Sequence, residues 1–529
     1  EIFLLNLMRF NLIFSLTGTL VAFFGLSFIF PIITGIVLGE NYMDIFYMFV
    51  IPMLFCLIFG FIFSSYFHIE EDIRNREAFA LVSIAWILMV LVGAFPYYAA
   101  ENFDLMSYQI GIAGAIFESM SGLTTTGATI LEITDESQVV NSEQYSNGYF
   151  DAPKSLLLWR SQTQWLGGMG IIVLATIIFS RLFGGGIQVL QAEMPGTGVT
   201  RLKPQMAQTA RLLWTLYFFL TLTEIILLYL AGLPFYDAIC NSFSTVSTGG
   251  FSPRIDSIGS YNSASVDFIV TFFMLISGVN FVILYYIFNH IKDNSKSIQS
   301  RFKNIYVLLK DNEELKVYLF LILSCSSLIL INLVLEFNED QSFNSNFSYT
   351  IFQTVSLLTG TGFTTTNYAL WPKMSIFVLL LIMFMGGCAG STTGGLKTVR
   401  IMLLFKALKR ELLLVIHPRA IIKLRIGKKV LDESLFRNVG VFFFIFIMIF
   451  LLGSLVTLYL EPSLTLIDGI SISLSCLANI GPGVGAIGPS TTYYGFGDPT
   501  VLVLSFLMML GRLEIITVLL LFFPDTYRD

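Results

Sequence analysis

Long apolar runs separated by short polar segments dominate the chain. An α-helix that crosses a bilayer needs about 20 apolar residues, and ten runs come close to that length or exceed it. They are Asn11–Leu38, Met43–Tyr66, Ala78–Ala99, Ser155–Arg181, Met206–Ala231, Val266–Asn289, Leu315–Leu335, Met374–Leu404, Phe436–Leu460 and Val501–Phe523. The pattern predicts an all-α integral membrane protein.

After the first two runs the others form pairs, and each pair encloses a shorter semi-polar stretch that ends in Ser, Thr and Gly. The four stretches are residues 118–127, 240–249, 353–362 and 472–481. Their final glycines recur at intervals of 113 to 122 residues. A near-constant period indicates an internal repeat, so we expect four units of helix, short pore helix, Gly turn and helix. The predicted boundaries are 1–70 for two N-terminal helices, then 71–190, 191–300, 301–425 and 426–529 for the units.

Composition supports a membrane protein and argues against an enzyme. Hydrophobic residues make up 55% of the chain and charged residues only 12%, about half the usual charged share of a soluble domain. The five cysteines lie scattered in apolar stretches and the three histidines lie near the ends of segments. This distribution suggests no disulfide framework, zinc site or catalytic cluster. We expect no enzymatic activity, no covalent cofactor and no nucleic-acid partner.

The basic residues gather on one predicted side of the membrane. Segments 181–211, 291–316 and 397–437 hold 4, 6 and 11 Lys or Arg, whereas residues 98–152 hold eight Asp or Glu and no Lys or Arg. Because cytoplasmic loops carry the excess of Lys and Arg, the basic side is predicted to be cytoplasmic, together with both termini. The semi-polar stretches then dip into the membrane from outside, where acidic loops concentrate cations.

Backbone chemistry suggests what such stretches do. Non-helical backbone at membrane depth persists only where protein buries it or where it lines a water-filled cavity. Carbonyl groups arranged around an axis replace the hydration shell of a cation, and Gly permits the positive φ that such turns use. Four copies therefore favour a cation pore. The alternative is that they are tight, Thr- and Gly-rich turns that only pack helices together.

Four motifs carry a family resemblance. Thr-Thr-Thr-Gly-Ala (124–128), Val-Ser-Thr-Gly-Gly-Phe-Ser (246–252), Thr-Gly-Thr-Gly-Phe (359–363) and Asn-Ile-Gly-Pro-Gly (479–483) resemble the filter signatures of the Trk/Ktr/HKT potassium transporter superfamily. Two additional N-terminal helices and a Gly-rich segment before Lys397 make the chain similar to a TrkH-type membrane subunit.

The resemblance implies a fold, a substrate and partners. It implies a pseudo-fourfold array of pore-loop units, a homodimer in the lipid of the cell inner membrane, and a cytosolic nucleotide-binding regulatory subunit of the TrkA type. Nucleotide is expected only on that partner. Gly at the filter position of the first loop implies potassium, although Ala478, Asn479 and Ile480 make the fourth loop depart from the Thr pattern. The implied potassium-binding filter residues are Thr125, Thr126, Gly127, Ser247, Thr248, Gly249, Gly360, Thr361, Gly362, Asn479, Ile480 and Gly481.

A Gly-rich segment interrupts the run Met374–Leu404. So many glycines predict a break in the helix, and a loop at that depth must lie inside protein or in the pore. The resemblance implies an intramembrane gate below the filter. A plain kink or a close helix contact is the alternative. The implied gate residues are Gly386, Gly387, Cys388, Ala389, Gly390, Ser391, Thr392, Thr393, Gly394 and Gly395, with Arg512.

Arg512 lies halfway along the last apolar run, where a charge is expensive and suggests function. The resemblance places it in the pore near the gate, where it repels ions. The alternative is a buried ion pair, with Glu224 as a candidate partner because Glu514 lies on another helix face. Glu224 itself is expected to be structural and to bond a loop or Arg160. Glu118, on the first pore helix, either holds the filter from behind or adds a negative field.

Two transport mechanisms remain open from the sequence. The first is channel-like potassium conduction through a four-loop filter, gated by the loop and by the cytosolic partner. The second is a sodium- or proton-coupled symporter, which commonly uses inverted repeats. Units that repeat every two spans in one orientation favour the pore.

Overall fold

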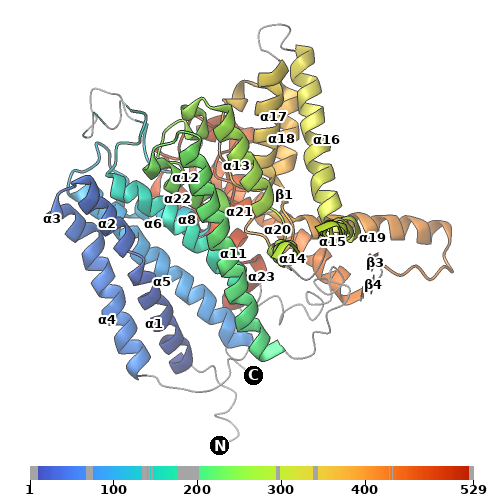
Figure 1. Cartoon of the computed structure of the whole chain (residues 1–529), viewed down its shortest axis with the longest axis horizontal. Helices are drawn as coiled ribbons and strands as arrows, with labels where there is room; N and C mark the ends of the chain where they lie inside the picture. The colour runs from blue at the N-terminus through green and yellow to red at the C-terminus, as the bar shows by residue number, and fades with distance from the viewer. Residues whose placement is uncertain are drawn as a thin grey trace, which may run out of the picture.

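The computed structural model describes residues 10–66, 75–133, 140, 143, 147–174, 202–292, 298–336, 343–427, 429–431 and 433–522. These residues are mostly helical, and the helices form a bundle (Figure 1). The first part of the chain contains α1 (Phe10–Leu26), α2 (Ile29–Leu38), α3 (Tyr42–Ile45), η2 (Phe46–Val50), α4 (Ile51–Tyr66), α5 (Asn75–Asn102), α6 (Gly111–Leu123), α8 (Lys154–Leu174), α11 (Leu202–Leu230), α12 (Phe235–Val246), η5 (Ser257–Tyr261), α13 (Ala264–Ser277) and α14 (Phe281–Lys292). The second part contains α15 (Ile298–Asp311), α16 (Glu313–Glu336), α17 (Phe343–Leu358), η6 (Tyr368–Leu370), α18 (Lys373–Met383), β1 (Met385–Gly386), β2 (Leu396–Lys397), α19 (Thr398–Ile416), β3 (Arg425–Ile426), β4 (Lys429–Val430), α20 (Glu433–Leu460), α21 (Leu466–Ala478), η7 (Gly485–Ile487), α22 (Asp498–Arg512), α23 (Ile515–Leu519) and η8 (Leu520–Phe522).

Six helical segments in the described residues are long and apolar enough to cross a membrane. They coincide with six of the ten predicted runs. The six segments are Phe10–Leu38, Tyr42–Ser65, Glu77–Asn102, Ala210–Leu230, Glu313–Glu336 and Phe436–Leu460. The prediction of a multi-pass helical membrane protein is therefore confirmed, but not every predicted span is one straight helix.

Three of the other predicted runs are broken. The run Val266–Asn289 is bent by 106° between α13 and α14, because the Asn280 side chain accepts a hydrogen bond from Val282 N (2.8 Å) and starts a new helix. The last run ends its helix at Arg512, and Glu514 then adopts a left-handed φ of 64°. Continuous helices were therefore the wrong prediction at both places, whereas the predicted break in Met374–Leu404 is confirmed.

The predicted span Ser155–Arg181 is described only as far as Leu174. The rest of that run lies outside the described residues.

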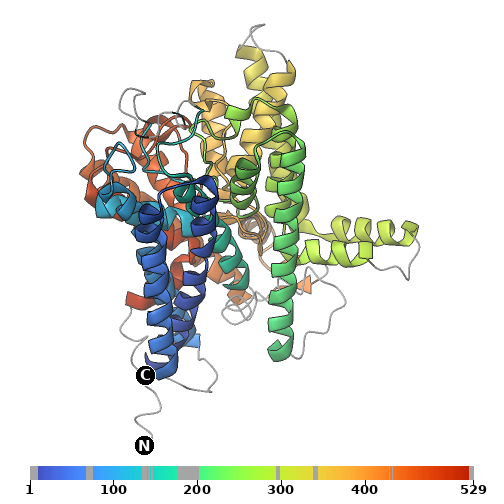
Figure 2. The same ribbon diagram turned by 60° about the vertical axis from the view of Figure 1, so that its left-hand side comes forward.

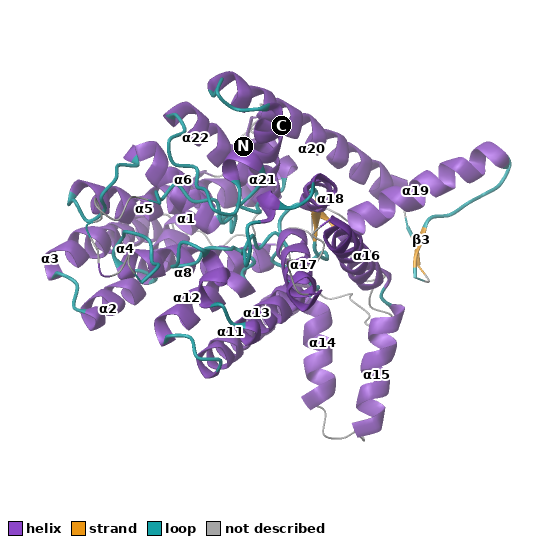
Figure 3. Cartoon of the chain, turned by 90° about the horizontal axis from the view of Figure 1, so that it is seen from above, coloured by secondary structure: helices purple, strands orange, loops and turns teal. Residues whose placement is uncertain are grey.

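Four shorter helices, α6, α12, α17 and α21, lie between the long ones and are largely buried. The start of α21 shows why one of them forms. Thr465 and Asp468 make a capping box, in which each side chain bonds the other residue's backbone N–H. A loop without regular secondary structure follows each of the four helices. Viewed from above, these loops gather at the centre of the molecule with helices around them (Figure 3).

Two parts of the chain project sideways from the bundle. The yellow-green hairpin of α14 and α15 does so in Figure 2, and α19 with the short β3–β4 ladder does so in Figure 3. The ladder is antiparallel, with Arg425 opposite Val430. A second, parallel pair joins Met385 to Leu396 and Gly386 to Lys397, which closes the ends of the segment between α18 and α19.

Candidate functional site

Four loops at the centre of the bundle share one backbone conformation. We define loop 1 as residues 124–130, loop 2 as 247–253, loop 3 as 359–365 and loop 4 as 478–484. In each loop, two residues with positive φ flank one residue without it. The flanking pairs are Thr125 (50°) and Gly127 (78°), Thr248 (54°) and Gly250 (83°), Gly360 (67°) and Gly362 (80°), and Asn479 (55°) and Gly481 (95°).

Hydrogen bonds fix which residues correspond between the loops. The middle residue of each loop donates its backbone N–H to the carbonyl of a serine five residues earlier. These bonds are Thr126 to Ser121 (2.9 Å), Gly249 to Ser244 (2.7 Å), Thr361 to Ser356 (2.9 Å) and Ile480 to Ser475 (3.0 Å).

The counterpart of Gly127 in loop 2 is therefore Gly250. The sequence prediction placed it at Gly249 and used Ser247, Thr248 and Gly249 as the triplet, so its register in loop 2 is wrong by one residue. The geometry gives Thr248, Gly249 and Gly250. The signal was present in the sequence, because only this shift aligns a serine in all four stretches.

The loops contact one another in a closed ring. A Cβ added to Gly127 would lie closer than 3.0 Å to the carbonyl oxygen of Gly249. The same holds for Gly250 against Thr361 O, for Gly362 against Ile480 O and for Gly481 against Thr126 O. Each loop thus presents a glycine to the backbone of the next loop, and loop 4 returns to loop 1. A side chain at any of the four positions would push neighbouring loops apart.

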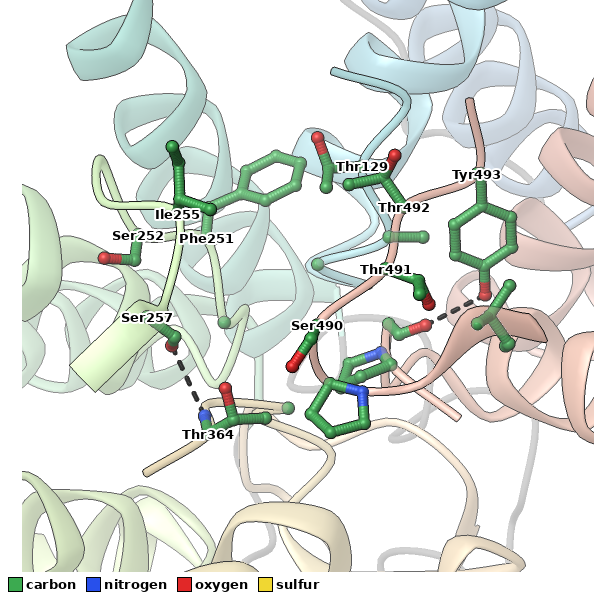
Figure 4. A pocket seen from close by; sticks show the side chains of 18 of the residues that line it. Thr129, Phe251, Ser252, Ile255, Ser257, Thr364, Ser490, Thr491, Thr492 and Tyr493 are labelled. Atoms are coloured by element: carbon green, nitrogen blue, oxygen red, sulfur yellow. Dashed lines mark hydrogen bonds between the residues drawn. The ribbon is translucent and has the colours of Figure 1, made fainter. Parts of the chain in front are cut away.

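The ring encloses a cavity. Gly127, Gly250, Gly362 and Gly481 all line it. In the close-up, side chains from all four loop regions surround this space, with Ser490, Thr491 and Thr492 along one side and Phe251 and Thr364 across from them (Figure 4). A cavity bordered by four backbone loops matches the arrangement expected of a site that handles a desolvated ion.

Buried polar side chains hold loops 1 and 2 from behind. Arg160 on α8 is 1% exposed and forms an ion pair with Glu118 on α6, with Nε and Oε1 2.6 Å apart. The other Glu118 oxygen accepts from Ile130 N in loop 1 (2.9 Å). Of the two roles considered for Glu118 from the sequence, the contacts favour support of loop 1 from behind. Of the two partners expected for Glu224, a loop or Arg160, the second is wrong, because the acidic partner of Arg160 is Glu118.

The segment 386–395 lies against the loops. Cys388 N donates to Gly278 O (2.9 Å), and Thr248 Oγ1 in loop 2 donates to Thr392 Oγ1 (3.2 Å). A Cβ on Gly394 would meet the carbonyl oxygen of Ala478 in loop 4. The predicted segment is thus an irregular loop in contact with two of the four loops, not a simple helix kink. We call residues 386–395 the crossing loop.

Two basic side chains bond carbonyl groups of the crossing loop. Arg512 is 3% exposed, and it donates to Thr392 O (2.6 Å) from Nη1 and to Gly167 O (3.4 Å) from Nη2. Lys397, which the sequence analysis did not select, bonds Thr393 O. Glu514 pairs with Arg400 (2.6 Å). The structure thus places Arg512 beside the crossing loop. The alternative of an ion pair between Arg512 and Glu224 is wrong, because the guanidinium bonds the carbonyl groups of Thr392 and Gly167.

A separate network of buried side chains lies beside the cavity and includes its lining residue Arg254. The buried Asp237 carboxylate accepts from Arg254 Nε (2.9 Å) and from the hydroxyls of Tyr149 (2.8 Å) and Tyr261 (3.0 Å). Burial raises the pKa of Tyr149, and the Asp237 charge raises it further. Both tyrosines are therefore neutral donors near neutral pH, which keeps Arg254, one of the cavity-lining residues, in place.

Apolar helices long enough to span a membrane, packed around a central ring of irregular backbone, define a multi-pass membrane protein. Comparison with known proteins makes the class specific. The model of the TrkH family, described as cation transport proteins, matches residues 45–527. The chain belongs to this family.

Relatives and a solved structure agree with that assignment. The "Trk system potassium uptake protein TrkH" of Salmonella typhimurium is 35% identical over 87% of this chain and 88% of its own length. The protein of the same name in Vibrio parahaemolyticus is 33% identical over 99% of this chain and its full length. The crystal structure of the potassium transporter TrkH from Vibrio parahaemolyticus matches this chain with a TM-score of 0.82 at 30% identity. The match covers 98% of this chain and all of that one.

Proposed function

We propose that this chain is the ion-translocating subunit of a potassium uptake system and conducts potassium as a channel does. The observation that carries the proposal is the closed ring in which each of four loops presents a positive-φ glycine to the next loop. The relatives named as Trk system potassium uptake proteins support potassium as the ion.

The proposed filter consists of the backbone of the four loops. Potassium would shed water as it enters the cavity and would be coordinated by carbonyl and hydroxyl oxygens in its place. The proposed residues are Thr125, Thr126 and Gly127; Thr248, Gly249 and Gly250; Gly360, Thr361 and Gly362; and Asn479, Ile480 and Gly481. The membrane potential would drive entry, at about 2.3 kcal/mol for each charge and 100 mV.

Four pseudo-symmetric pore-loop units would build this filter. They would centre on α6, α12, α17 and α21, and α1 to α4 would lie outside them. The shared serine-to-loop hydrogen bonds support the equivalence of the four units. The unit boundaries drawn from the sequence stay predictions.

The crossing loop is the proposed gate. It would block the passage below the filter, and Arg512 would add a positive charge that repels cations there. Support comes from its contacts with Thr248 and Ala478 and from the bond of Arg512 to Thr392 O. Movement of this loop would then open the passage.

The wider assembly is also a proposal. We infer a homodimer in the cell inner membrane with both termini in the cytoplasm. A TrkA-type regulatory subunit would bind nucleotide and control the gate from the basic side of the membrane. The basic segment 397–437 is a candidate surface for that subunit and for anionic lipid.

Ion flux into liposomes tests the proposal. Purified full-length protein is reconstituted with potassium, rubidium, sodium or lithium outside and no other gradient. We expect uptake of potassium and rubidium well above sodium, and loss of that preference in Gly127→Ser and Gly362→Ser. Gly440→Ser is the matched control, because a Cβ on Gly440 of α20 meets nothing within 4 Å.

Two results would contradict the proposal. Flux that requires a sodium or proton gradient would indicate a symporter instead of a channel. Equal flux of all four cations would leave a pore but remove the claim of potassium selectivity.

A further inference from the structure

The four loops are not held in the same way. In loops 3 and 4, the serine that accepts the loop N–H also bonds the loop through its own hydroxyl. Ser356 Oγ donates to Phe363 O (2.7 Å) and Ser475 Oγ donates to Gly481 O (2.5 Å). Tyr493 adds a second bond to Gly481 O (2.9 Å). These two loops are therefore fixed by their own short helices and the segment that follows.

The corresponding serines of loops 1 and 2 do not have this role. The hydroxyls of Ser121 and Ser244 are buried and have no hydrogen-bond partner among the described residues. Buried polar groups normally find partners, so the missing bonds mark a real difference between the two halves of the ring. Something else must fix loops 1 and 2.

Arg160 of α8 bridges these two loops. Its Nη2 donates to Thr129 Oγ1 in loop 1 (2.9 Å), and its Nη1 donates to Ser252 O in loop 2 (3.3 Å). The guanidinium carbon also lies 4.1 Å from the centre of the Phe251 ring. Together with the ion pair to Glu118, these contacts use most of the donors that an arginine carries.

Gln164 lies one helical turn further along α8 and on the same face. Its Nε2 donates to Gly249 O (2.7 Å) and its Oε1 accepts from Phe251 N (3.0 Å). The side chain is fully buried. Gln164 therefore holds the carbonyl that faces Gly127 across the contact between loops 1 and 2.

A buried ion pair is a poor way to gain stability, because desolvation offsets most of the attraction and an apolar pair often serves as well. The position of the Glu118–Arg160 pair behind loops 1 and 2 therefore suggests a role other than stability. Discrimination between cations depends on the number and placement of the coordinating carbonyl groups, and Arg160 and Gln164 fix the backbone at the junction of two loops.

We propose that Arg160 and Gln164 are positioning residues that set the ion discrimination of loops 1 and 2, as the serine hydroxyls do for loops 3 and 4. The inference rests on the proposed potassium filter and identifies which side chains determine its selectivity. It predicts that removing the loop contacts of either Arg160 or Gln164 lowers the preference for potassium while the protein still folds and conducts.

The test compares potassium and sodium uptake by full-length variants in liposomes. Gln164→Leu keeps the size of the side chain and removes both hydrogen bonds to loop 2. The double variant Glu118→Leu/Arg160→Met removes the ion pair without leaving one buried charge unpaired. The matched control is Gln162→Leu, since Gln162 is also buried in α8 but bonds Ser27 O (2.7 Å) and not the loops. Thermal unfolding of each purified variant reports whether it is folded.

We expect the ratio of potassium to sodium uptake to fall about tenfold in Gln164→Leu, as the combined effect of its two lost hydrogen bonds. The ratio should fall in the double variant too. Gln162→Leu should keep the wild-type ratio. If folded Gln164→Leu or the folded double variant keeps the wild-type ratio of potassium to sodium uptake, the inference is wrong and the proposed filter stands. A wild-type protein without any preference would overturn both.

Discussion

Single glycines determine whether the ring of loops can close. Gly250 has a φ of 83°, and its Cβ position meets the carbonyl oxygen of Thr361 in the next loop. An alanine there would suffer both a disfavoured backbone conformation and a clash with backbone that no rotamer change relieves. The contact between loops 2 and 3 would therefore open.

We predict that Gly250→Ala loses most potassium uptake in liposomes, since backbone strain of about 1–3 kcal/mol corresponds to a loss of about 5- to 150-fold. The matched control is Gly440→Ala, which adds the same methyl group in open space on α20 and should behave as wild type. Wild-type uptake and selectivity in Gly250→Ala would show that Gly250 is not the counterpart of Gly127.

The charge of Arg512 makes a second prediction at this scale. Its guanidinium is buried beside the crossing loop and bonds Thr392 O. Arg512→Gln should raise potassium flux several-fold, because it removes both a repelling charge and a bond that holds the loop. Arg512→Lys keeps the charge and should stay much closer to wild type. Equal effects of both variants on flux would contradict an electrostatic role.

At the scale of elements, the crossing loop is held from the N-terminal end of α16. The buried Glu314 carboxylate accepts a hydrogen bond from Ala389 N (2.6 Å). Its neighbour Glu313 instead pairs with Lys406 of α19. Two adjacent acidic residues at the start of one helix thus have separate partners, and only one of them touches the crossing loop.

We predict that Glu314→Leu raises potassium flux measured without any cytosolic partner. The change leaves the buried Ala389 N–H without its acceptor, at a cost of about 1–3 kcal/mol to the closed loop. Glu313→Gln is the matched control and should leave flux unchanged. If the two variants have the same flux, Glu314 does not hold the gate.

The sequence predicted long, uniformly apolar elements well and predicted breaks poorly. Hydropathy alone identified the segments now seen as α1 to α5, α11, α16 and α20, because lipid-facing helices need only length and composition. It predicted the break at the Gly-rich crossing loop, where composition changes sharply. It missed the bend at Asn280 and the left-handed Glu514, because one capping side chain or one φ angle leaves almost no trace in hydropathy.

In the candidate site too, the sequence predicted some features correctly and missed others. Motif matching placed three of the four loops in register. It failed in loop 2, where two adjacent glycines allow two alignments. The serine shared by all four stretches favours the second alignment, and the bond from Gly249 N to Ser244 O shows that it is the correct one. Arg160 and Gln164 were not selected at all as loop contacts, since their partners lie up to 92 residues away in the sequence.

At the scale of the whole molecule, the ring depends on segments from opposite ends of the chain. Asn479 Nδ2 in loop 4 donates to Thr126 Oγ1 in loop 1 (3.0 Å), across 353 residues. No local pattern specifies that contact. It forms only when helices near both ends pack together, as α6 and α22 do. The loops therefore assemble with the bundle and not before it, so a filter of this kind is a property of the complete fold.

The orientation of the whole molecule gives the last prediction. The positive-inside pattern predicts that the cavity mouth faces outside and that the basic segment 397–437 lies in the cytoplasm. Ser490, which lines the cavity, and Ala420, which follows α19, are both exposed.

We expect a membrane-impermeant maleimide to label Ser490→Cys in intact cells, and Ala420→Cys only after permeabilisation. The wild-type chain controls for its own cysteines, of which Cys56, Cys240, Cys388 and Cys476 are buried and Cys325 is partly so. The opposite labelling pattern would mean that the molecule has the reverse orientation in the membrane. Cations would then meet the crossing loop before the ring, and the proposed uptake direction would have to be abandoned.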